Sequence, residues 1–473
     1  MADPNAEGAD PRAGTDDAPA FREAAGAIAE GFLAAVRTAL AAGDAPALAV
    51  LAGDLHEADL ADLIAALDAD ERVPFVRLMG ERLDFTALTE LDESLRVAIL
   101  RALPPEFVAE GLTRIESDDA VYILEDLSEA QKNAILARLP HLARMRVSRS
   151  LDYPDETAGR RMQTEFLAVP GFWTVGQTID TIREDNDLPE EFYEVFVVDP
   201  AYRLIGTVAL DRLLRARRGA RMREVMRENQ FTVRATEDQE EVAQLFKRYN
   251  LMSVAVVDDA ARLVGMLTID DIVDVIEQEA EEDIRALGGV GDEEMSDSVF
   301  YAARSRFPWL FVNMFTAFLS ASVIAIFDET ISHMVALAVL MPIVASLGGN
   351  SGTQAMTVTV RALAMRELSR HNALRVLGRE MLVALMNGAV MALIVGAVAS
   401  LWFTNHEVGL VIAAALVANV LTAGFVGVVI PLALSAVRID PAVASGVLLT
   451  AITDMVGFSA FLGLSTWWFA LAA

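Results

Sequence analysis

The segment 270–288, with the sequence "DDIVDVIEQEAEEDIRALG", contains acids at spacings that can hold a divalent cation. If it is helical, Asp271, Asp274, Glu279 and Glu282 lie on one face at 100° per residue. Like charges so close repel, and a divalent cation among them relieves the repulsion. The opposite side carries the apolar residues Val273, Ile276, Ile284 and Leu287. The pattern predicts a cation-binding face or, as the alternative, an ordinary solvated one.

A second group of polar residues lies within strongly apolar sequence. Asp454 is near the middle of the stretch Ala442–Leu471, and "PIVASLGGNSGTQ" (Pro342–Gln354) contains Gly349 and Asn350. Proline and three glycines predict a broken helix there, with carbonyl oxygens freed from the backbone ladder. An intramembrane carboxylate is a functional candidate by default, and a structural acid would need a basic partner inside the apolar stretches, which have none. We therefore expect these residues to line a pore.

The chemistry of these groups favours a hard cation. Carboxylate, carbonyl and amide oxygens suit Mg²⁺, which gives up its water reluctantly. The chain has no cysteine and only five scattered histidines, so a zinc or copper site is poorly supported. The net charge of −30 excludes nucleic acid as an expected partner. We find no nucleotide-binding loop of the ATPase type and no activated nucleophile, so we expect no enzyme and no primary pump.

Five apolar stretches are long enough to cross a membrane, which needs about 20 residues each. They are Trp309–Phe327, Ile331–Ala355, Met381–Phe403, Val408–Val437 and Ala442–Leu471. Buried helices of a soluble protein are the alternative, but five such runs joined by short polar loops argue against it. The membrane lipid is therefore an expected partner.

Basic residues gather at one end of these stretches. They are Arg304, Arg306, Arg361, Arg366, Arg370, Arg375, Arg379 and Arg438. Lysine and arginine mark cytoplasmic loops, and each of these loops is on the side of the long N-terminal region. We expect a multi-pass protein of the cell (inner) membrane with cytoplasmic N-terminal domains and an outside C-terminus. The first residues show no secretory signal, and 1–20 are expected to be a disordered tail.

The soluble part has two textures. Leucine, isoleucine and valine at helical spacing predict a helical domain over 21–155. Further along, "VFVVDPAYRLIGTVALD" (Val195–Asp211) matches "VAVVDDAARLVGMLTID" (Val254–Asp270) at a constant spacing of 59 residues. The repeat resembles a tandem pair of CBS domains, which often bind adenine nucleotides through Gly-x-x-Ser/Thr-x-x-Asp. The second copy has Gly265, Thr268 and Asp271, although Thr268 as a helix cap is the alternative. The first copy departs, with Ala209 and Arg212.

The order of parts, "PIVASLGGNSGTQ", "DPAVASG" (Asp440–Gly446) and Asp454 resemble the MgtE family of magnesium channels. The resemblance implies a homodimer with a pore at the dimer axis, lined by the second and fifth spans. It implies that Asp454 binds the ion, with Asp440, Asn350 and Gly349 as the other predicted pore residues. The implied fold is multidomain: an α-helical N-terminal domain, an α/β tandem CBS pair at 156–278, an acidic linker at 279–306 and an all-α transmembrane domain of five helices at 307–473.

The resemblance also implies that cytosolic Mg²⁺ closes the pore by bridging acids of the soluble part. The implied sensor acids are Asp118, Asp238, Asp271, Asp274, Glu279, Glu282 and Asp283. Asn250 and Tyr122 stand where the pattern leads us to expect acids, which implies weaker closure. A broader Co²⁺ or Mn²⁺ transporter, or a membrane-anchored CBS sensor that conducts nothing, is the alternative to a Mg²⁺ channel.

Overall fold

The computed structural model describes residues 21–23, 26–184, 188–189, 192–228, 231–291, 299–368, 371–437 and 439–469. The chain divides into two compact units, Met1–Glu279 and Ala280–Ala473, which we describe separately. The expected disordered tail 1–20, and Arg370 and Arg438, lie outside the described residues.

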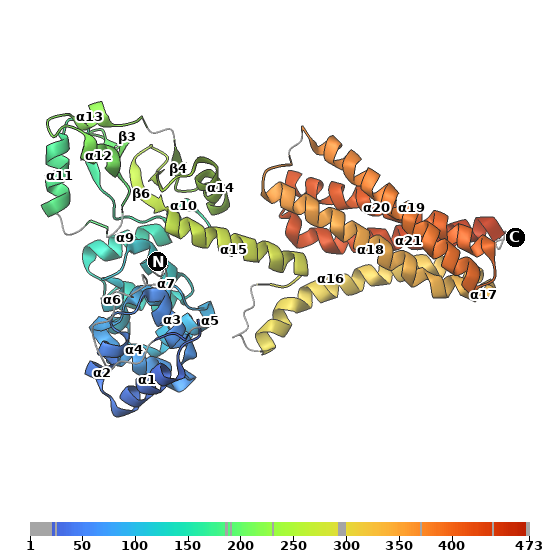
Figure 1. The fold of residues 1–473 in the computed structure, drawn as a ribbon, viewed down its shortest axis with the longest axis horizontal. Coiled ribbons are helices and arrows are strands. Elements are labelled where there is room, and N and C mark those ends of the chain that lie inside the picture. Colours follow the sequence, from blue (N-terminus) through green and yellow to red (C-terminus); the bar gives the residue numbers. More distant parts are fainter. Residues whose placement is uncertain are drawn as a thin grey trace, which may run out of the picture. The chain divides into compact units, whose positions relative to one another are not determined.

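The first unit begins with a helical domain, as predicted (Figure 1). Its termini carry local signals: Asp44 caps α2 by accepting from the Ala47 N–H, and Asp68 and Glu71 form a capping box on α4. Its core contains Phe75, Leu63 and Ile123. The elements are α1 (Glu30–Ala42), α2 (Ala45–Ala52), α3 (Glu57–Ala66), α4 (Ala69–Met79), η1 (Gly80–Arg82), η2 (Phe85–Leu88), α5 (Glu93–Ala102), α6 (Pro105–Leu112), α7 (Ser117–Glu125), α8 (Glu129–Leu136) and α9 (His141–Leu151).

The sequence repeat folds into two three-stranded sheets of the same design. In each, the first strand pairs in parallel with the second, and the second pairs antiparallel with the third. The irregularity at Val197/Val198 recurs at Val256/Val257, 59 residues later. The elements are α10 (Ala158–Arg161), β1 (Ala168–Pro170), α11 (Val175–Glu184), β2 (Glu194–Val198), β3 (Leu204–Ala209), α12 (Leu210–Arg215), α13 (Met222–Val225), β4 (Thr232–Arg234), α14 (Gln239–Tyr249), β5 (Ser253–Val257) and β6 (Leu263–Thr268).

The acidic segment is helical, as the periodicity predicts, and forms α15 (Ile269–Gly288). Near the beginning of α15, Ile272 and Val275 are buried and belong to the core of the second repeat. Val273 and Ile276, on the side predicted to be apolar, are exposed. Near the end of the helix, Leu287 packs against apolar residues of the second unit.

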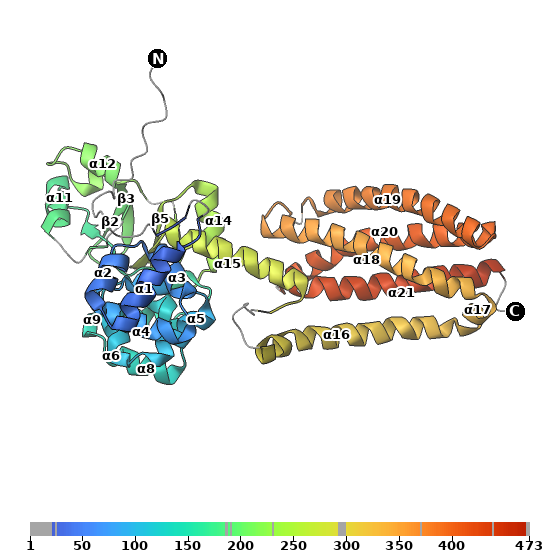
Figure 2. The ribbon, with the colours of Figure 1, turned by 60° about the horizontal axis from the view of Figure 1, so that its bottom comes forward.

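The second unit contains five helices long and apolar enough to cross a membrane, the number that the sequence predicts. They are α16 (Val299–Ile326), α18 (Val335–Ala364), α19 (Ala373–Trp402), α20 (His406–Ala436) and α21 (Pro441–Phe469), with the short α17 (Asp328–His333) after the first. Helix α20 lies between α19 on one side and α18 and α21 on the other (Figure 2). In the most apolar 18-residue window, 61% of α20 is buried, against 6% of α16.

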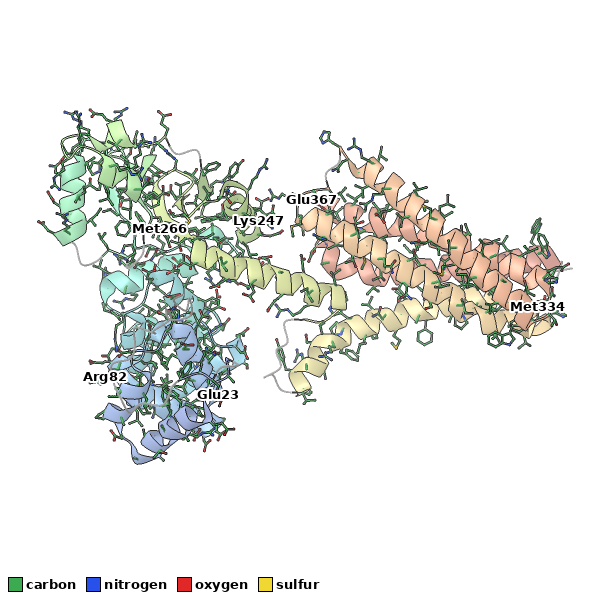
Figure 3. The ribbon with its side chains drawn as sticks, viewed as in Figure 1. Glu23, Arg82, Lys247, Met266, Met334 and Glu367 are labelled. Atoms are coloured by element: carbon green, nitrogen blue, oxygen red, sulfur yellow. The ribbon has the colours of Figure 1, made fainter. Side chains whose placement is uncertain are left out.

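Helix α18 corrects one prediction. It is continuous from Val335 to Ala364, and Met334 and Glu367, labelled in Figure 3, lie just beyond its two ends. The expected break at Pro342 is therefore wrong. A proline removes one backbone donor, and the packed helices around a membrane helix support it against unwinding. The arginines Arg361, Arg375 and Arg379, expected in a loop, lie inside the ends of α18 and α19.

Candidate cation sites

Three acids meet where the helical domain contacts the start of α15. Asp118 and Asp119 are in the first turn of α7, and Asp271 is in the first turn of α15. Burial, and next the charge of Asp271, raises the pKa of Asp118 well above its ordinary value. Burial raises the pKa of Asp119 to about 8 and that of Asp271 to about 7. Each carboxylate therefore loses solvation and faces like charges, two effects that a cation reverses.

More acids lie around these three. Burial, followed by the charge of Glu90, raises the pKa of Asp274 to about 6. Burial likewise raises the pKa values of Glu57 and Glu90. The charges of Asp270 and Asp274 add to the rise for Glu57, and the charge of Glu57 adds to the rise for Glu90. We call Glu57, Glu90, Asp118, Asp119, Asp270, Asp271 and Asp274 the acid cluster. Since its members come from α3, the η2–α5 connection, α7 and α15, the cluster joins the helical domain to α15.

Local structure fixes the α7 side of the acid cluster. The Ser117 hydroxyl and N–H at the start of α7 donate to Glu165 Oε2, at 2.6 and 3.3 Å. Arg146 holds the other oxygen of Glu165 at 2.9 Å. One oxygen of Asp118 is buried with no hydrogen-bond partner in the described part of the chain. Across those residues, no three acidic or histidine side chains are grouped closely enough to hold one metal directly.

An arginine contact lies beside the acid cluster, and we call it the arginine clasp. Arg161 at the end of α10 pairs with Glu125 of α7 at 3.1 Å and donates to Gln239 of α14 and Gln278 of α15, each at 3.1 Å. Its guanidinium also lies 5.2 Å from the centre of the Tyr122 ring. The clasp therefore links the helical domain, the second repeat and α15 without any metal.

Tyr122 occupies a position where an acid was expected, and the clasp gives it a different role. The Arg96 guanidinium lies 4.4 Å from the ring centre, and Arg96 is buried and paired with Asp126 at 2.5 Å. Each of the two guanidinium groups, of Arg96 and Arg161, therefore lies within cation–π distance of the Tyr122 ring. The second departure, Asn250, ends α14 in the left-handed conformation (φ 51°), which asparagine tolerates better than most residues.

The other predicted sensor acids lie outside the acid cluster. Asp238 caps α14 by accepting from the Glu240 N–H at 2.9 Å. Glu279 accepts from the Gln239 amide at 2.7 Å. Asp283 belongs to the second unit, where burial, followed by the charge of Asp440, raises its pKa. Glu282 also lies on α15, beyond the acid cluster. Of the seven predicted sensor acids, the structure brings together Asp118, Asp271 and Asp274.

The predicted nucleotide-binding pair makes an internal hydrogen bond. The Thr268 hydroxyl donates to Asp271 Oδ2 at 2.6 Å. The same carboxylate is a member of the acid cluster, facing Asp118 and Asp119. Asp271 is thus both a predicted sensor acid and a predicted nucleotide-binding residue. A ribose could reach it only by replacing the hydrogen bond from Thr268.

The predicted pore residues lie on α18 and α21. Asp454 is half-buried near the middle of α21, and Asn350 is exposed on α18. At Gly349, an added Cβ would meet no atom within 4 Å. Asp440 begins α21 by accepting from the Ala442 N–H at 2.8 Å. Polar groups exposed on a membrane helix need water or a protein partner, since lipid satisfies neither an amide nor a carboxylate.

Several polar residues of these sites were missed from the sequence. Glu57 and Glu90 are isolated acids in ordinary surface segments, and only folding brings them toward α15. Asn419 on α20 is fully buried and bonded to α18. Its signal was available, because an asparagine in the centre of an apolar stretch is rare enough to examine.

Family models match three parts of the chain. A model described as a divalent cation transporter, MgtE, matches residues 341–464. A model of the MgtE intracellular N domain matches 55–156, and a CBS domain model matches 222–278. The two CBS repeats share their strand pairing, although the model match covers the second repeat.

The chain is also similar to curated proteins. The magnesium transporter MgtE of Enterococcus faecalis is 35% identical over 305 residues, covering 64% of this chain and 67% of that protein. The magnesium transporter MgtE of Thermus thermophilus is 32% identical over 367 residues, covering 76% of this chain and 78% of that protein. A crystal structure of the cytosolic domain of the Mg²⁺ channel MgtE in complex with ATP is 30% identical, covers 51% of this chain and 99% of that one, and gives a TM-score of 0.48.

Proposed function

The chain belongs to the MgtE family of magnesium transporters, and we propose that it carries hydrated Mg²⁺ into the cytoplasm and is closed by cytosolic Mg²⁺. Its function is Mg²⁺ transport by a multi-pass membrane protein. The direction and the closure are our proposals. The observation that carries the closure is the acid cluster, because desolvated carboxylates from separate elements are held together best when a dication lies among them.

The proposed path is lined by α18 and α21. Asp454 would supply the fixed charge that holds a hydrated dication, and Asn350 and Gly349 would supply polar oxygens. These groups are exposed or half-buried in a single chain, which supports a homodimer whose two copies enclose the path. Asp440, at the start of α21, would attract ions at the cytoplasmic mouth. An inside-negative potential of 100 mV favours entry by about 4.6 kcal/mol per dication.

The proposed closure acts through α15. Without Mg²⁺, repulsion within the acid cluster favours separation of the helical domain from α15. Bound Mg²⁺ removes this repulsion, so the helical domain stays packed against α15. The far end of the same helix packs Ala286 and Leu287 against Met356, Val360 and Leu449 of the membrane helices. Asp238 and Glu279 of the first unit, and Glu282 and Asp283 of the second, would bind Mg²⁺ more weakly, each set within its own unit. Mg²⁺ must bind the closed state more tightly than the open one, or it shifts nothing.

Three finer assignments are part of the proposal. The N-terminal domains are cytoplasmic and the C-terminus is outside, with the domain limits that the sequence predicts. An adenine nucleotide is a further ligand of the second CBS repeat, held by Thr268 and Asp271. The Thr268 hydroxyl donates to Asp271, and Asp271 is also a member of the acid cluster. Nucleotide and Mg²⁺ would therefore compete for this carboxylate.

Ion flux into liposomes, with Mg²⁺ varied on each side separately, tests conduction and closure together. We expect flux down the Mg²⁺ gradient, and loss of flux when Mg²⁺ is raised on the side of the soluble domains. Protein of known orientation is needed, which protease digestion of the exposed soluble part provides. Equal flux of Co²⁺ or Mn²⁺ would favour a broader divalent transporter. No flux from folded protein would favour the non-conducting CBS sensor.

A further inference from the structure

Asn419 places an amide where three membrane helices meet. The side chain belongs to α20 and is fully buried. Its Nδ2 donates to the Val344 carbonyl of α18 at 2.9 Å. Its Oδ1 is buried with no hydrogen-bond partner among the described residues. An amide inside a membrane bundle is costly unless it is bonded, so its presence at this crossing needs a reason beyond filling space.

Two glycines make room for this amide. A Cβ at Gly348 of α18 would collide with the Asn419 Nδ2, and one at Gly457 of α21 would lie 2.6 Å from it. Gly348 is one turn after Val344, the residue whose carbonyl accepts the hydrogen bond. The amide therefore lies against α18 and α21 at positions where each of these helices has a glycine, and neither helix can rotate there without striking it.

The same two helices carry the groups of the proposed path. Asn350 is two residues after Gly348 on α18, and Asp454 is three residues before Gly457 on α21. A rotation of either helix about its axis moves its polar residue off the path by several ångströms, because side chains lie about 5 Å or more from a helix axis. Asn419 itself is buried behind both helices and does not line the path.

We propose that Asn419 is a positioning residue for ion permeation, which fixes the rotation of α18 against α21 so that Asn350 and Asp454 face one path. The inference rests on the proposed function, because it takes both groups to line that path.

The test uses full-length protein in liposomes for flux and in detergent for thermal stability. In Asn419→Ala, the maximal Mg²⁺ flux falls at least tenfold and the half-saturating Mg²⁺ concentration rises at least threefold. The double variant Asn419→Ala with Gly457→Ala adds a methyl group to the space that the amide leaves. We expect it to recover at least half of the lost Tm while flux and half-saturation stay altered.

Two single glycine variants complete the set. Gly457→Ala alone keeps the amide but pushes it from its place, and should lower flux at least threefold. Gly378→Ala on α19, where a Cβ meets no atom within 4 Å, should leave flux unchanged. Recovery of flux together with Tm in the double variant would overturn the proposal, since packing alone would then suffice.

A parallel Asp454→Ala measurement separates the two levels of inference. If that variant conducts normally, the proposed path itself is wrong. If it loses flux while the double variant conducts as the parent does, the path stands and the positioning role of Asn419 fails.

Discussion

The acid cluster and Asp454 use the same functional group in opposite ways. In the cluster, carboxylates from four separate elements lie close to one another, and burial and the charges of neighbouring acids raise the pKa values of Asp118, Asp119, Asp271 and Asp274. Asp454 stands on one helix, α21, in apolar sequence. Many coupled charges suit a sensor, because binding changes how elements are held together. A single charge suits permeation, because an ion bound by one carboxylate can leave again.

The largest expected effect tests the role of Asp454 in the membrane helices. Asp454→Ala should lower Mg²⁺ flux at least about 100-fold, equivalent to about 2.8 kcal/mol. A dication in a low-dielectric path needs fixed negative charge nearby. Flux into liposomes checks it, with the elution volume of the variant as the test for intact assembly. Normal flux would remove Asp454 from the proposed path.

The next effect separates sensing from conduction. Replacing Asp271, Asp274, Glu279 and Glu282 with their amides should preserve conduction and raise the Mg²⁺ concentration for half-closure about 30-fold, or about 2 kcal/mol. Protease protection of the soluble part should no longer rise with Mg²⁺.

A matched control removes the same number of charges from exposed positions of the helical domain. Its substitutions are Asp70→Asn, Glu81→Gln, Glu110→Gln and Glu129→Gln. It should close as the parent does. Equal loss of closure in both variants would mean that total charge matters and the arrangement of the acids does not.

A smaller effect comes from the arginine clasp, which links α7 to α15, two of the elements that carry the acid cluster, without Mg²⁺. Arg161→Gln removes the pair with Glu125 and the contacts to Gln239 and Gln278. The contact between the helical domain and α15 should lose about 1.5 kcal/mol of stability, the lower end of the range for hydrogen bonds to a charged group. Protection of the Mg²⁺-free protein from protease should fall about tenfold, whereas the exposed Arg149→Gln should change it little. Unchanged protection in Arg161→Gln would show that the clasp contributes nothing.

The smallest effect is a pH dependence of the soluble part. The folded pKa values of Asp119, Asp271 and Asp274 are raised to about 8, 7 and 6, above the ordinary value of 3.8. Their contribution to stability is therefore complete below about pH 4 and is lost as pH rises through about 6 to 8. In full-length protein without Mg²⁺, Tm should fall over that window, and saturating Mg²⁺ should flatten the fall. Asp119→Asn should also reduce it; a parent-like slope in this variant would contradict the assignment.

The features predicted correctly from the sequence are those that leave a regular pattern along the chain. Apolar length alone located five membrane helices, and the constant spacing between Val195–Asp211 and Val254–Asp270 anticipated two sheets of the same register. The acids of α15 were found because they share a short segment. Glu57 and Glu90 were not, since their role depends on which distant elements fold together, and a lone surface acid carries no such information.

Two errors have physical causes. Pro342 was expected to break α18, but the helix continues, because a missing donor in a packed membrane helix is a local loss that the neighbours tolerate. The apolar residues Val273 and Ile276 were placed on a common side of α15 opposite the acids, yet Ile272 and Val275 are the buried ones. The side of a helix that packs is chosen by the core it joins, and this core belongs to the second repeat.

The central place of α20 has a consequence for how the protein is made. Helices α18 and α19 of the second unit are synthesised before α20, but both pack on α20, whose 31 residues take about 2–6 s to synthesise at ~5–20 residues per second. During that interval neither the Val344 carbonyl nor the position of Gly348 yet has its contact with Asn419. Chains ending before α20 would present two helices without their common neighbour, and membrane quality control should degrade them faster than chains ending after it.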